Sequence, residues 1–202
     1  MDKPETELIR VFIATAISSE AQQKLAAVQT EMKRLPCHIG WVAPQNIHLT
    51  LVFLGDIFPE QIEVVKAVLE SAAATALECS GEIHGLGSFG SPRHPRVIWA
   101  GLTGHLEPLL EVQAQLATDL KAQGFYLDDR PFTPHLTLGR LRAAKGAAEL
   151  EEVLGRYRET RFGGFIVNRL LLMRSQLTAH GPEYSTLHQV AFPPPPATER
   201  ES

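Results

Sequence analysis

Cysteine is scarce in this chain: only Cys37 and Cys79 occur among 202 residues. Their separation fits no metal-binding spacing, and two cysteines do not make the disulfide framework of a small secreted domain. Long hydrophobic runs are also missing, since no stretch approaches the ~18 uninterrupted apolar residues of a membrane span. The N-terminus has neither the basic start nor the apolar stretch of a signal peptide. We therefore expect a soluble, cytoplasmic protein with free thiols.

An excess of positive charge is absent as well. The 23 aspartates and glutamates outnumber the 19 lysines and arginines, which gives a formal net charge of −4. This balance argues against a broad electrostatic surface for nucleic acid, which usually accompanies a strongly basic domain. A short nucleic acid end held in a locally basic cleft stays compatible with it. The hydrophobic fraction of 44% is ordinary for a globular chain and allows a sizeable core.

Hydrophobic periodicity predicts a mixture of strands and helices. We predict strands over 8–15, 47–55, 96–102, 131–141 and 183–192, and one or two strands over 162–177. We predict helices from Ser18 or Ser19 to Pro36, from Pro59 to about 77, over 106–123 and over 146–157. The segment 79–92 looks like a strand that runs into a glycine-rich turn.

The chain contains the tetrapeptide His-Leu-Thr-Leu twice, at His48–Leu51 and at His135–Leu138. Side chains alternate between the two faces of a strand, so each histidine shares a face with the threonine two residues later. The leucines of each copy point to the other face and can anchor the strand in the core. If the two strands face each other, two imidazoles and two hydroxyls converge on one site.

Such a site suits acid–base chemistry at a phosphodiester. Two imidazoles can hold opposite protonation states near neutral pH, so that one accepts a proton while the other donates one. Threonine hydroxyls can hold the non-bridging oxygens of a phosphate. A metal site is the weaker interpretation, because zinc prefers three or four nitrogen, sulfur or carboxylate ligands and neither motif contains a carboxylate. Asp56, just after the first motif, is an unsupported candidate ligand.

The repeat and the order of elements predict an α+β fold. We expect a duplicated bilobal fold, in which two mainly antiparallel sheets face a central cleft and helices pack on the outside. One domain of two pseudo-symmetric lobes would span residues 1–192. The Pro-rich, charged segment 193–202 is expected to be a disordered tail.

The paired motifs and their flanks resemble a known family, the 2H phosphoesterases, and within it the RNA 2′,3′-cyclic phosphodiesterases that are also called 2′-5′ RNA ligases. The similarity rests on "RVFIA", "NIHLTLVFLG", "RVIWAG", "RPFTPHLTLGR" and "SQLTAHGPEY", in that order, and covers about residues 8–192. The resemblance implies hydrolysis of an RNA 2′,3′-cyclic phosphate end to a 2′-phosphate, without ATP or a metal. It also implies that the reverse reaction could join 2′-5′ linkages. Compatible substrates include tRNA fragments, and nothing in the sequence demands more than a monomer.

The resemblance also implies roles for individual residues. His48 would be the proton donor to the departing 3′ oxygen, and His135 the proton acceptor from water. Thr50 and Thr137 would steady the phosphate oxygens.

Three further candidates depend on how the strands bend and pack. Arg140 matches a family arginine near the phosphate, but simple alternation puts it on the face opposite His135. It reaches the site only if the strand bulges or twists near Gly139; otherwise it is a surface arginine. Phe12 and Phe53 could stack on a terminal base or could be core residues. Two functional alternatives stay open: a phosphodiesterase for another small cyclic phosphate, and a non-catalytic module that binds RNA ends.

Overall fold

The computed structural model describes residues 7–91, 93–143, 145–178 and 181–194. The strands are β1 (Ile9–Ala16), β2 (Ile39–Trp41), β3 (His48–Ile57), β4 (Cys79–Ser91), β5 (His94–Gly104), β6 (His135–Leu141), β7 (Arg161–Val167), β8 (Arg169–Thr178) and β9 (Gly181–Ala191). The helices are α1 (Ser19–Met32), α2 (Ile62–Thr75), α3 (Glu107–Ala122) and α4 (Ala147–Arg156), with short 3-10 helices η1 (Pro44–Asn46) and η2 (Pro59–Gln61). The α+β class is confirmed.

The strands form an antiparallel sheet in the order β7-β4-β5-β6-β3-β1-β8-β9, and β2 pairs with the last residues of β6, beyond the pairing of β6 with β3. The order is symmetric about the junction of β6 with β3, with four strands on either side. That junction is narrow, because Leu49 and Leu136 form the one registered pair between β3 and β6. The two expected sheets are therefore the two halves of one curled sheet, which meet at the strands that carry the repeated motif.

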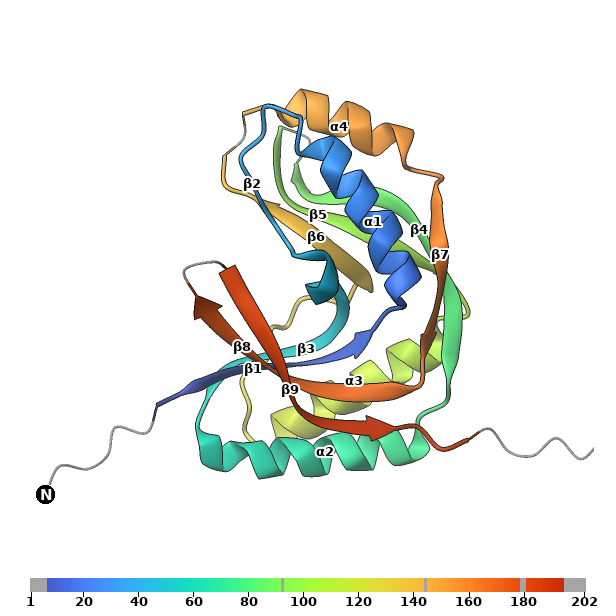
Figure 1. Cartoon of the computed structure of the whole chain (residues 1–202). Coiled ribbons are helices and arrows are strands. Elements are labelled where there is room, and N and C mark those ends of the chain that lie inside the picture. Colours follow the sequence, from blue (N-terminus) through green and yellow to red (C-terminus); the bar gives the residue numbers. More distant parts are fainter. Residues whose placement is uncertain (1–6, 92, 144, 179–180, 195–202) are drawn as a thin grey trace, which may run out of the picture.

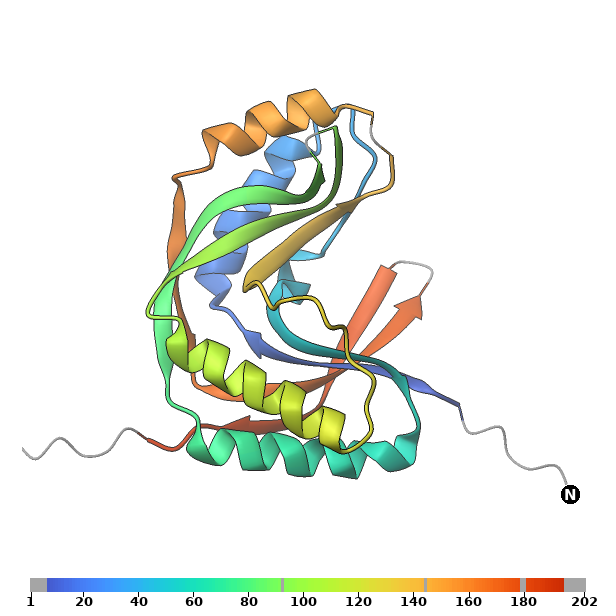
Figure 2. The ribbon, with the colours of Figure 1, turned by 180° about the vertical axis from the view of Figure 1, so that it is seen from behind.

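Helices cover each half of the sheet. α2 and α3 lie side by side against the half that contains β3, β8 and β9, whereas α1 and α4 pack against the half that contains β4 and β7 (Figure 1). The view from behind shows the same division (Figure 2). The helix that follows β1 thus crosses to the half that contains β6, and the helix that follows β5 crosses to the half that contains β3. This exchange ties the two halves together.

Local signals explain most element boundaries. The Ser18 hydroxyl accepts a hydrogen bond from the amide of Ala21 at 3.2 Å, as an N-cap should. Pro59 opens a 3-10 turn before α2 rather than the α-helix itself. The core consists of the apolar faces of the four helices and the inward-facing residues of the strands, among them the leucines of both motifs. All four motif leucines are almost fully buried, as predicted: Leu49, Leu51, Leu136 and Leu138.

The glycine-rich segment differs from its prediction. β4 continues as a strand through Ser91 instead of entering a turn. Gly85 adopts a φ of +73° at an irregularity in the pairing with β5, a conformation that costs glycine little. At Gly87 an added Cβ would lie 2.4 Å from the indole of Trp99, so glycine there leaves room for that ring. The glycines of β4 therefore serve irregular pairing and close packing.

Two expectations concern the chain ends and the thiols. Most of the predicted tail, from residue 195 on, lies outside the described residues. Within the described ranges, no helix is both long and apolar enough to cross a membrane. Cys37 and Cys79 are both free, as expected.

Candidate active site

The two motifs meet at the junction of β3 and β6. Leu49 pairs with Leu136 in antiparallel register, and both leucines point into the core. The residues on either side of this pair point the other way, because faces alternate along a strand. Continuing the register by one residue puts His48 across from Thr137, and Thr50 across from His135. Cross-strand neighbours share a face, so we call this set of four side chains the catalytic face.

Both imidazoles are oriented by the same hydrogen bond. The Nδ1 atom of His48 lies 2.7 Å from the carbonyl oxygen of Asn46, and the Nδ1 atom of His135 lies 2.7 Å from the carbonyl oxygen of Thr133. A carbonyl oxygen can only accept, so each Nδ1 carries a hydrogen. In the neutral ring this leaves the Nε2 lone pair free for proton transfer. The Nε2 atom of His48 lies 3.0 Å from the Thr50 hydroxyl.

A β-bulge follows each motif threonine. On β6, Thr137 pairs with Trp99 and Gly139 pairs with Ile98, so Leu138 is an extra residue. On β3 the pairing partners of Ile13 and Ala14 show that Leu51 is the extra residue. The last leucine of each tetrapeptide is therefore a bulge residue, and each bulge reverses the alternation of the residues that follow it.

Arg140 can reach the site only if its strand bulges or twists near Gly139, and the bulge at Leu138 does this. Val97 and Trp99 lie two residues apart on β5 and share a face. Their partners on β6 are Arg140 and Thr137, which therefore also share a face. Arg140 lies on the same side as the threonine of the second motif. The positive charge of Arg140 also lowers the pKa of the His135 imidazole, as expected for neighbouring groups.

The bulge at Leu51 places Phe53 on the catalytic face by the same reasoning. Phe12 and Ala14 share a face of β1, and their partners on β3 are Phe53 and Thr50. The ring of Phe53 is 49% exposed, and the guanidinium carbon of Arg10 lies 5.1 Å from its centroid. Phe53 is thus open to a ligand, and its role in base stacking stays a prediction.

Phe12 is less suited to the role we predicted. Its ring is 2% exposed and stacks on the imidazole of His48, with centroids 4.8 Å apart and planes at 21°. Phe53 and Tyr184 also pack against it. A ring enclosed in this way offers no face to a nucleobase, so we correct the assignment: Phe12 supports His48. The sequence offered both interpretations of Phe12, and the core one describes its position.

Tyr184 is a member of the site that the sequence reasoning missed. Its ring meets His48 edge-on, with centroids 5.4 Å apart and planes at 81°. Burial raises the pKa of its phenol, whereas the charges of Arg140 and Arg10 act to lower it. Tyr184 therefore lies near His48 of the first motif and is also influenced by the charge of Arg140, which follows the second motif. These contacts show, without any use of the strand register, that the two motifs lie close together. The motif "SQLTAHGPEY" ends on this residue, but no local pattern shows that its strand lies beside β8, which in turn pairs with β1.

The second imidazole has its own aromatic neighbour. The ring of Phe89 meets His135 edge-to-face, with centroids 4.8 Å apart and planes at 89°, and Phe89 in turn packs against Trp99. These aromatic rings exclude water from one side of each histidine. A cavity of about 350 Å³ is lined by Asn46 and Tyr184 among others, and no residue of either motif is in its lining. A different cavity, of about 800 Å³, is bordered by the end of β1 and by β4 and β7, and no motif histidine or threonine lines it.

Burial lowers the pKa of both catalytic-face histidines. For His48 the loss of solvation is partly offset by the hydrogen bond to the Asn46 carbonyl, which favours the charged ring. For His135 burial is again the main cause, opposed by the bond to Thr133, and the charge of Arg140 lowers the pKa further. Both rings therefore favour the neutral form more strongly than a free imidazole does.

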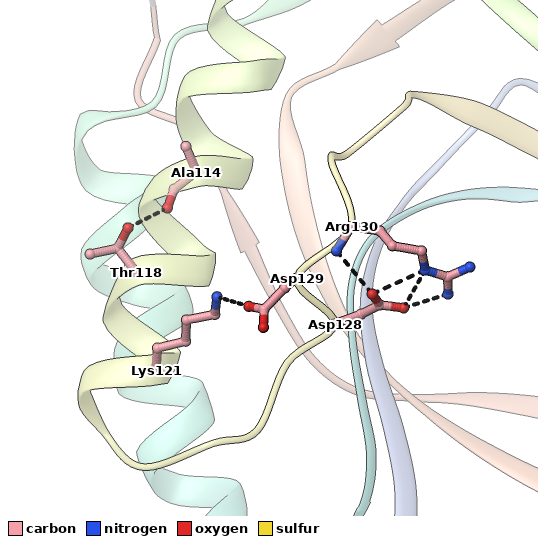
Figure 3. A network of polar contacts seen from close by, with 6 residues as sticks. All are labelled: Ala114, Thr118, Lys121, Asp128, Asp129 and Arg130. Atoms are coloured by element: carbon pink, nitrogen blue, oxygen red, sulfur yellow. Dashed lines mark hydrogen bonds and ion pairs between the residues drawn. The ribbon is translucent and has the colours of Figure 1, made fainter.

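The loop that leads into β6 is fixed by charge pairs. Lys121, in the last turn of α3, bonds to Asp129 at 2.7 Å, and the guanidinium of Arg130 pairs with the carboxylate of Asp128 (Figure 3). The amide of Arg130 also donates to Asp128 at 2.9 Å. Hydrogen bonds from Arg130 lower the pKa of Asp128 to about 2. These exposed pairs shape the segment just before Thr133, whose carbonyl holds His135.

No group of three or more histidine, cysteine, aspartate or glutamate side chains that could hold a metal ion is found within residues 7–91, 93–143, 145–178 and 181–194. Asp56, the carboxylate nearest the first motif in the sequence, is the backbone register partner of Arg10 between β3 and β1.

Comparison with known proteins agrees with this geometry. The model of the 2′-5′ RNA ligase superfamily matches residues 30–179. The RNA 2′,3′-cyclic phosphodiesterase of Aquifex aeolicus is 31% identical over 185 residues, which cover 91% of this chain and 97% of the relative. The enzyme of the same name from Methanothermobacter thermautotrophicus is 28% identical over 179 residues, covering 89% and 96% of the two chains.

Solved structures show the same fold. The protein TT0787 of Thermus thermophilus superposes with a TM-score of 0.76 at 27% identity and covers 91% of this chain and 98% of its own. E. coli LigT complexed with 3′-AMP also has a TM-score of 0.76, at 22% identity, and covers 92% of this chain and 99% of its own. The repeated motif, the symmetric sheet and these relatives agree, and the chain belongs to the 2′-5′ RNA ligase superfamily of 2H phosphoesterases.

Proposed function

We propose that this protein hydrolyses the 2′,3′-cyclic phosphate at RNA ends and leaves a 2′-phosphate. The observation that carries the proposal is the matched pair of imidazoles, each held by an Nδ1–H bond of 2.7 Å so that Nε2 is the nitrogen available for proton transfer. A site that only bound phosphate would gain more from permanently charged side chains than from two rings whose pKa values burial lowers. The relatives named RNA 2′,3′-cyclic phosphodiesterase support the same activity.

In the proposed reaction the two histidines act in opposite directions. The Nε2 atom of neutral His135 takes a proton from water as the water oxygen attacks phosphorus. The Nε2–H of protonated His48 gives its proton to the 3′ oxygen as the bond from phosphorus to that oxygen breaks. The 2′ ester bond survives, so the product carries a 2′-phosphate, and exchange of protons with solvent restores both rings. Each proton transfer contributes about 10²–10⁴-fold to the rate.

The phosphate would be held by neutral and charged donors together. Thr50 and Thr137 supply hydroxyls from the two strands, and Arg140 supplies a guanidinium on the face of Thr137. A guanidinium can donate two parallel hydrogen bonds to phosphate oxygens and offset the negative charge that builds up during attack. No ATP or metal takes part in these steps.

The same acid–base pair could also join RNA ends. An RNA 5′-hydroxyl in place of water would attack phosphorus, the bond from phosphorus to the 3′ oxygen would break, and the product would be a 2′-5′ linkage; we regard this ligation as a side activity. The natural partners of the proposed reaction are RNA ends with a cyclic phosphate, tRNA fragments among them, and one copy of the chain supplies both histidines. A smaller cyclic phosphate is the main alternative substrate, and the cavity of about 350 Å³ lined by Asn46 and Tyr184 would fit a group of nucleoside size.

One incubation separates the proposed hydrolysis from a module that only binds RNA ends. An oligonucleotide that ends in a 2′,3′-cyclic phosphate is mixed with the protein in excess chelator, and the ends are identified. Release of 2′-phosphate ends supports the proposal, and 3′-phosphate ends would mean that the other ester bond breaks. Recovery of unchanged substrate from a stable complex supports a binding module instead. The variant His135→Ala, prepared in the same way, controls for contaminating nucleases.

A further inference from the structure

A buried glutamine on α1 reaches the bulge of the second motif. Gln29 is 1% exposed, although it is polar and lies among the apolar residues that face the core. Its side-chain nitrogen donates to the carbonyl oxygen of Leu138 at 2.9 Å and to that of Val42 at 2.8 Å. The amide of Val42 donates to the same Leu138 carbonyl at 2.9 Å. The bulge residue is thereby fixed from two directions.

The conformation of Leu138 decides where Arg140 points. Without the extra residue, the alternation of β6 would continue unbroken and turn Arg140 away from Thr137. A bulge leaves backbone groups without partners in the sheet ladder. The carbonyl of Leu138 already accepts from the amide of Val42, and the side-chain amide of Gln29 supplies a second donor, which favours the bulged over the regular strand.

The other half of the molecule has a counterpart. The side-chain nitrogen of Gln113, on α3, lies 3.4 Å from the carbonyl oxygen of Leu51, the bulge residue that follows Thr50. The helices α1 and α3, which cross between the two halves of the sheet, thus each place a glutamine side chain at one of the two bulges. The bond of Gln29 is the shorter one, and its side chain is the more deeply buried of the two.

Burial of the Gln29 side chain also has a cost in folding free energy. Among the described residues, its Oε1 atom is one of two buried side-chain oxygens and nitrogens that lack a hydrogen-bond partner. An unsatisfied buried carbonyl destabilises a fold, and an apolar residue of the same length would avoid that cost. The amide therefore serves its two acceptors, not general packing.

We propose that Gln29 is a positioning residue, whose side-chain amide holds the Leu138 bulge and thereby keeps Arg140 on the catalytic face. This inference rests on the proposed phosphodiesterase function for its meaning in catalysis. The geometric part can be tested without any substrate.

The test compares Gln29→Met with Gln23→Met. Methionine matches the length of glutamine but has no amide, and Gln23 is an exposed residue of the same helix. The titration of the His135 imidazole is followed by NMR in each free protein. The groups that act on its pKa are the Thr133 carbonyl and Arg140, in addition to burial. Loss of the bulge withdraws Arg140, so Gln29→Met should raise the pKa of His135 as far as Arg140→Gln does, whereas Gln23→Met should leave it unchanged.

Kinetics supply the second measurement. Misplacement of a phosphate-binding group by about 1 Å costs up to ~100-fold, so kcat/KM on a cyclic phosphate substrate should fall by about 10- to 100-fold in Gln29→Met. The double variant Gln29→Met/Arg140→Gln should be no slower than Arg140→Gln alone, because both changes remove the same contact. Gln29→Asn, which keeps the amide but withdraws it by one methylene, replaces the methionine variant if that protein does not fold.

A His135 titration that is unchanged in a folded Gln29 variant overturns the positioning role, whatever happens to turnover. Additive losses in the double variant overturn it as well, since they would indicate a general loss of stability. If the wild-type protein does not hydrolyse cyclic phosphates, the proposed function fails, but the titration still decides whether Gln29 positions Arg140.

Discussion

At the scale of single residues, the two histidines are alike in orientation and different in surroundings. Each donates Nδ1–H to the carbonyl two residues before it, which fixes the ring and its tautomer. The hydroxyl of Thr50 contacts the Nε2 atom of His48, whereas the charge of Arg140 lowers the pKa of His135. The pair can therefore work as one unit in which the rings have separate tasks.

Replacing either histidine tests that unit. We expect His48→Ala and His135→Ala each to reduce the single-turnover rate on a cyclic phosphate substrate by at least about 10²-fold, because each removes one proton transfer. The double variant should be little slower than either single one, since the transfers belong to one step. Thermal unfolding checks that the variants remain folded. A single variant with nearly full activity would contradict the assignment.

The pH dependence follows from the direction of the two pKa shifts. The donor must be protonated, so activity falls as pH rises through its pKa, and the acceptor must be neutral, so activity falls as pH drops through its pKa. Burial lowers both pKa values below the ordinary 6.5 of an imidazole. The bell-shaped profile of kcat/KM, which reports the free protein, should therefore peak on the acid side of pH 6.5. A rate that rises monotonically to high pH would speak against two titrating imidazoles.

The variant Arg140→Gln sharpens this prediction. Without the nearby positive charge, the protonated form of His135 becomes easier to reach and its pKa rises. The acid limb of the bell should therefore move to higher pH, while the height of the bell falls because the phosphate loses a charged donor. A matched change at the exposed Arg156, which pairs with Glu31 away from the motifs, should leave the position of the bell unchanged.

At the scale of elements, the decisive features are the bulges that follow the two threonines. Sequence alternation predicted that each histidine shares a face with its threonine, and it reached the condition that β6 must bulge near Gly139 for Arg140 to join them. The bulge at Leu138 meets that condition. The equivalent bulge at Leu51 was not predicted, because alternating leucines look the same in a regular strand and in a bulged one.

Contacts between distant segments explain what else the sequence could not predict. The bond from Gln29 to Leu138 spans 109 residues, and neither end has a distinctive local pattern. Tyr184 joins the site because β9 pairs with β8 and β8 pairs with β1, which is a property of the sheet order. Phe12 was correctly placed in a strand, but only the stacking of its ring on His48 shows that it supports the imidazole.

Gly139 allows a test at this scale. A Cβ added there would lie 2.7 Å from the Cγ2 atom of Ile39 and 3.0 Å from the Cε3 atom of Trp41, so these two side chains, or β2 with them, would have to shift away from β6. We expect Gly139→Ala to destabilise the protein by about 1–3 kcal/mol, as overpacking does. It should also reduce activity by displacing the neighbouring Arg140.

The matched control for this change is Gly155→Ala in α4. An added Cβ at Gly155 has no atom within 4 Å, and alanine favours a helix by about 0.8–1.0 kcal/mol over glycine. Urea unfolding and turnover of the two variants give the comparison. A Gly139→Ala protein as stable and as active as the wild type would show that the packing of β2 on β6 does not fix the bulge.

At the scale of the whole molecule, the two halves meet at one registered backbone pair and are bound by crossing helices. The histidines come from different halves, so the site exists only where β3 and β6 meet. The chain has a net charge of −4, and the two cations that act on Tyr184 at the site are Arg10 and Arg140. We therefore expect the site to bind the terminal phosphate and its immediate neighbours rather than a long strand.

The charge distribution predicts how binding depends on RNA length and on salt. Each phosphate contact on a single strand contributes a slope of about −0.7 to the plot of log affinity against log salt, so two arginines give about −1.4. KM should therefore change little between a dinucleotide and a longer single-stranded RNA that end in the same cyclic phosphate. Steady-state kinetics at several salt concentrations measure both quantities. A KM that drops steeply with length, with a slope several times larger, would mean that a basic surface beyond the catalytic face binds the RNA.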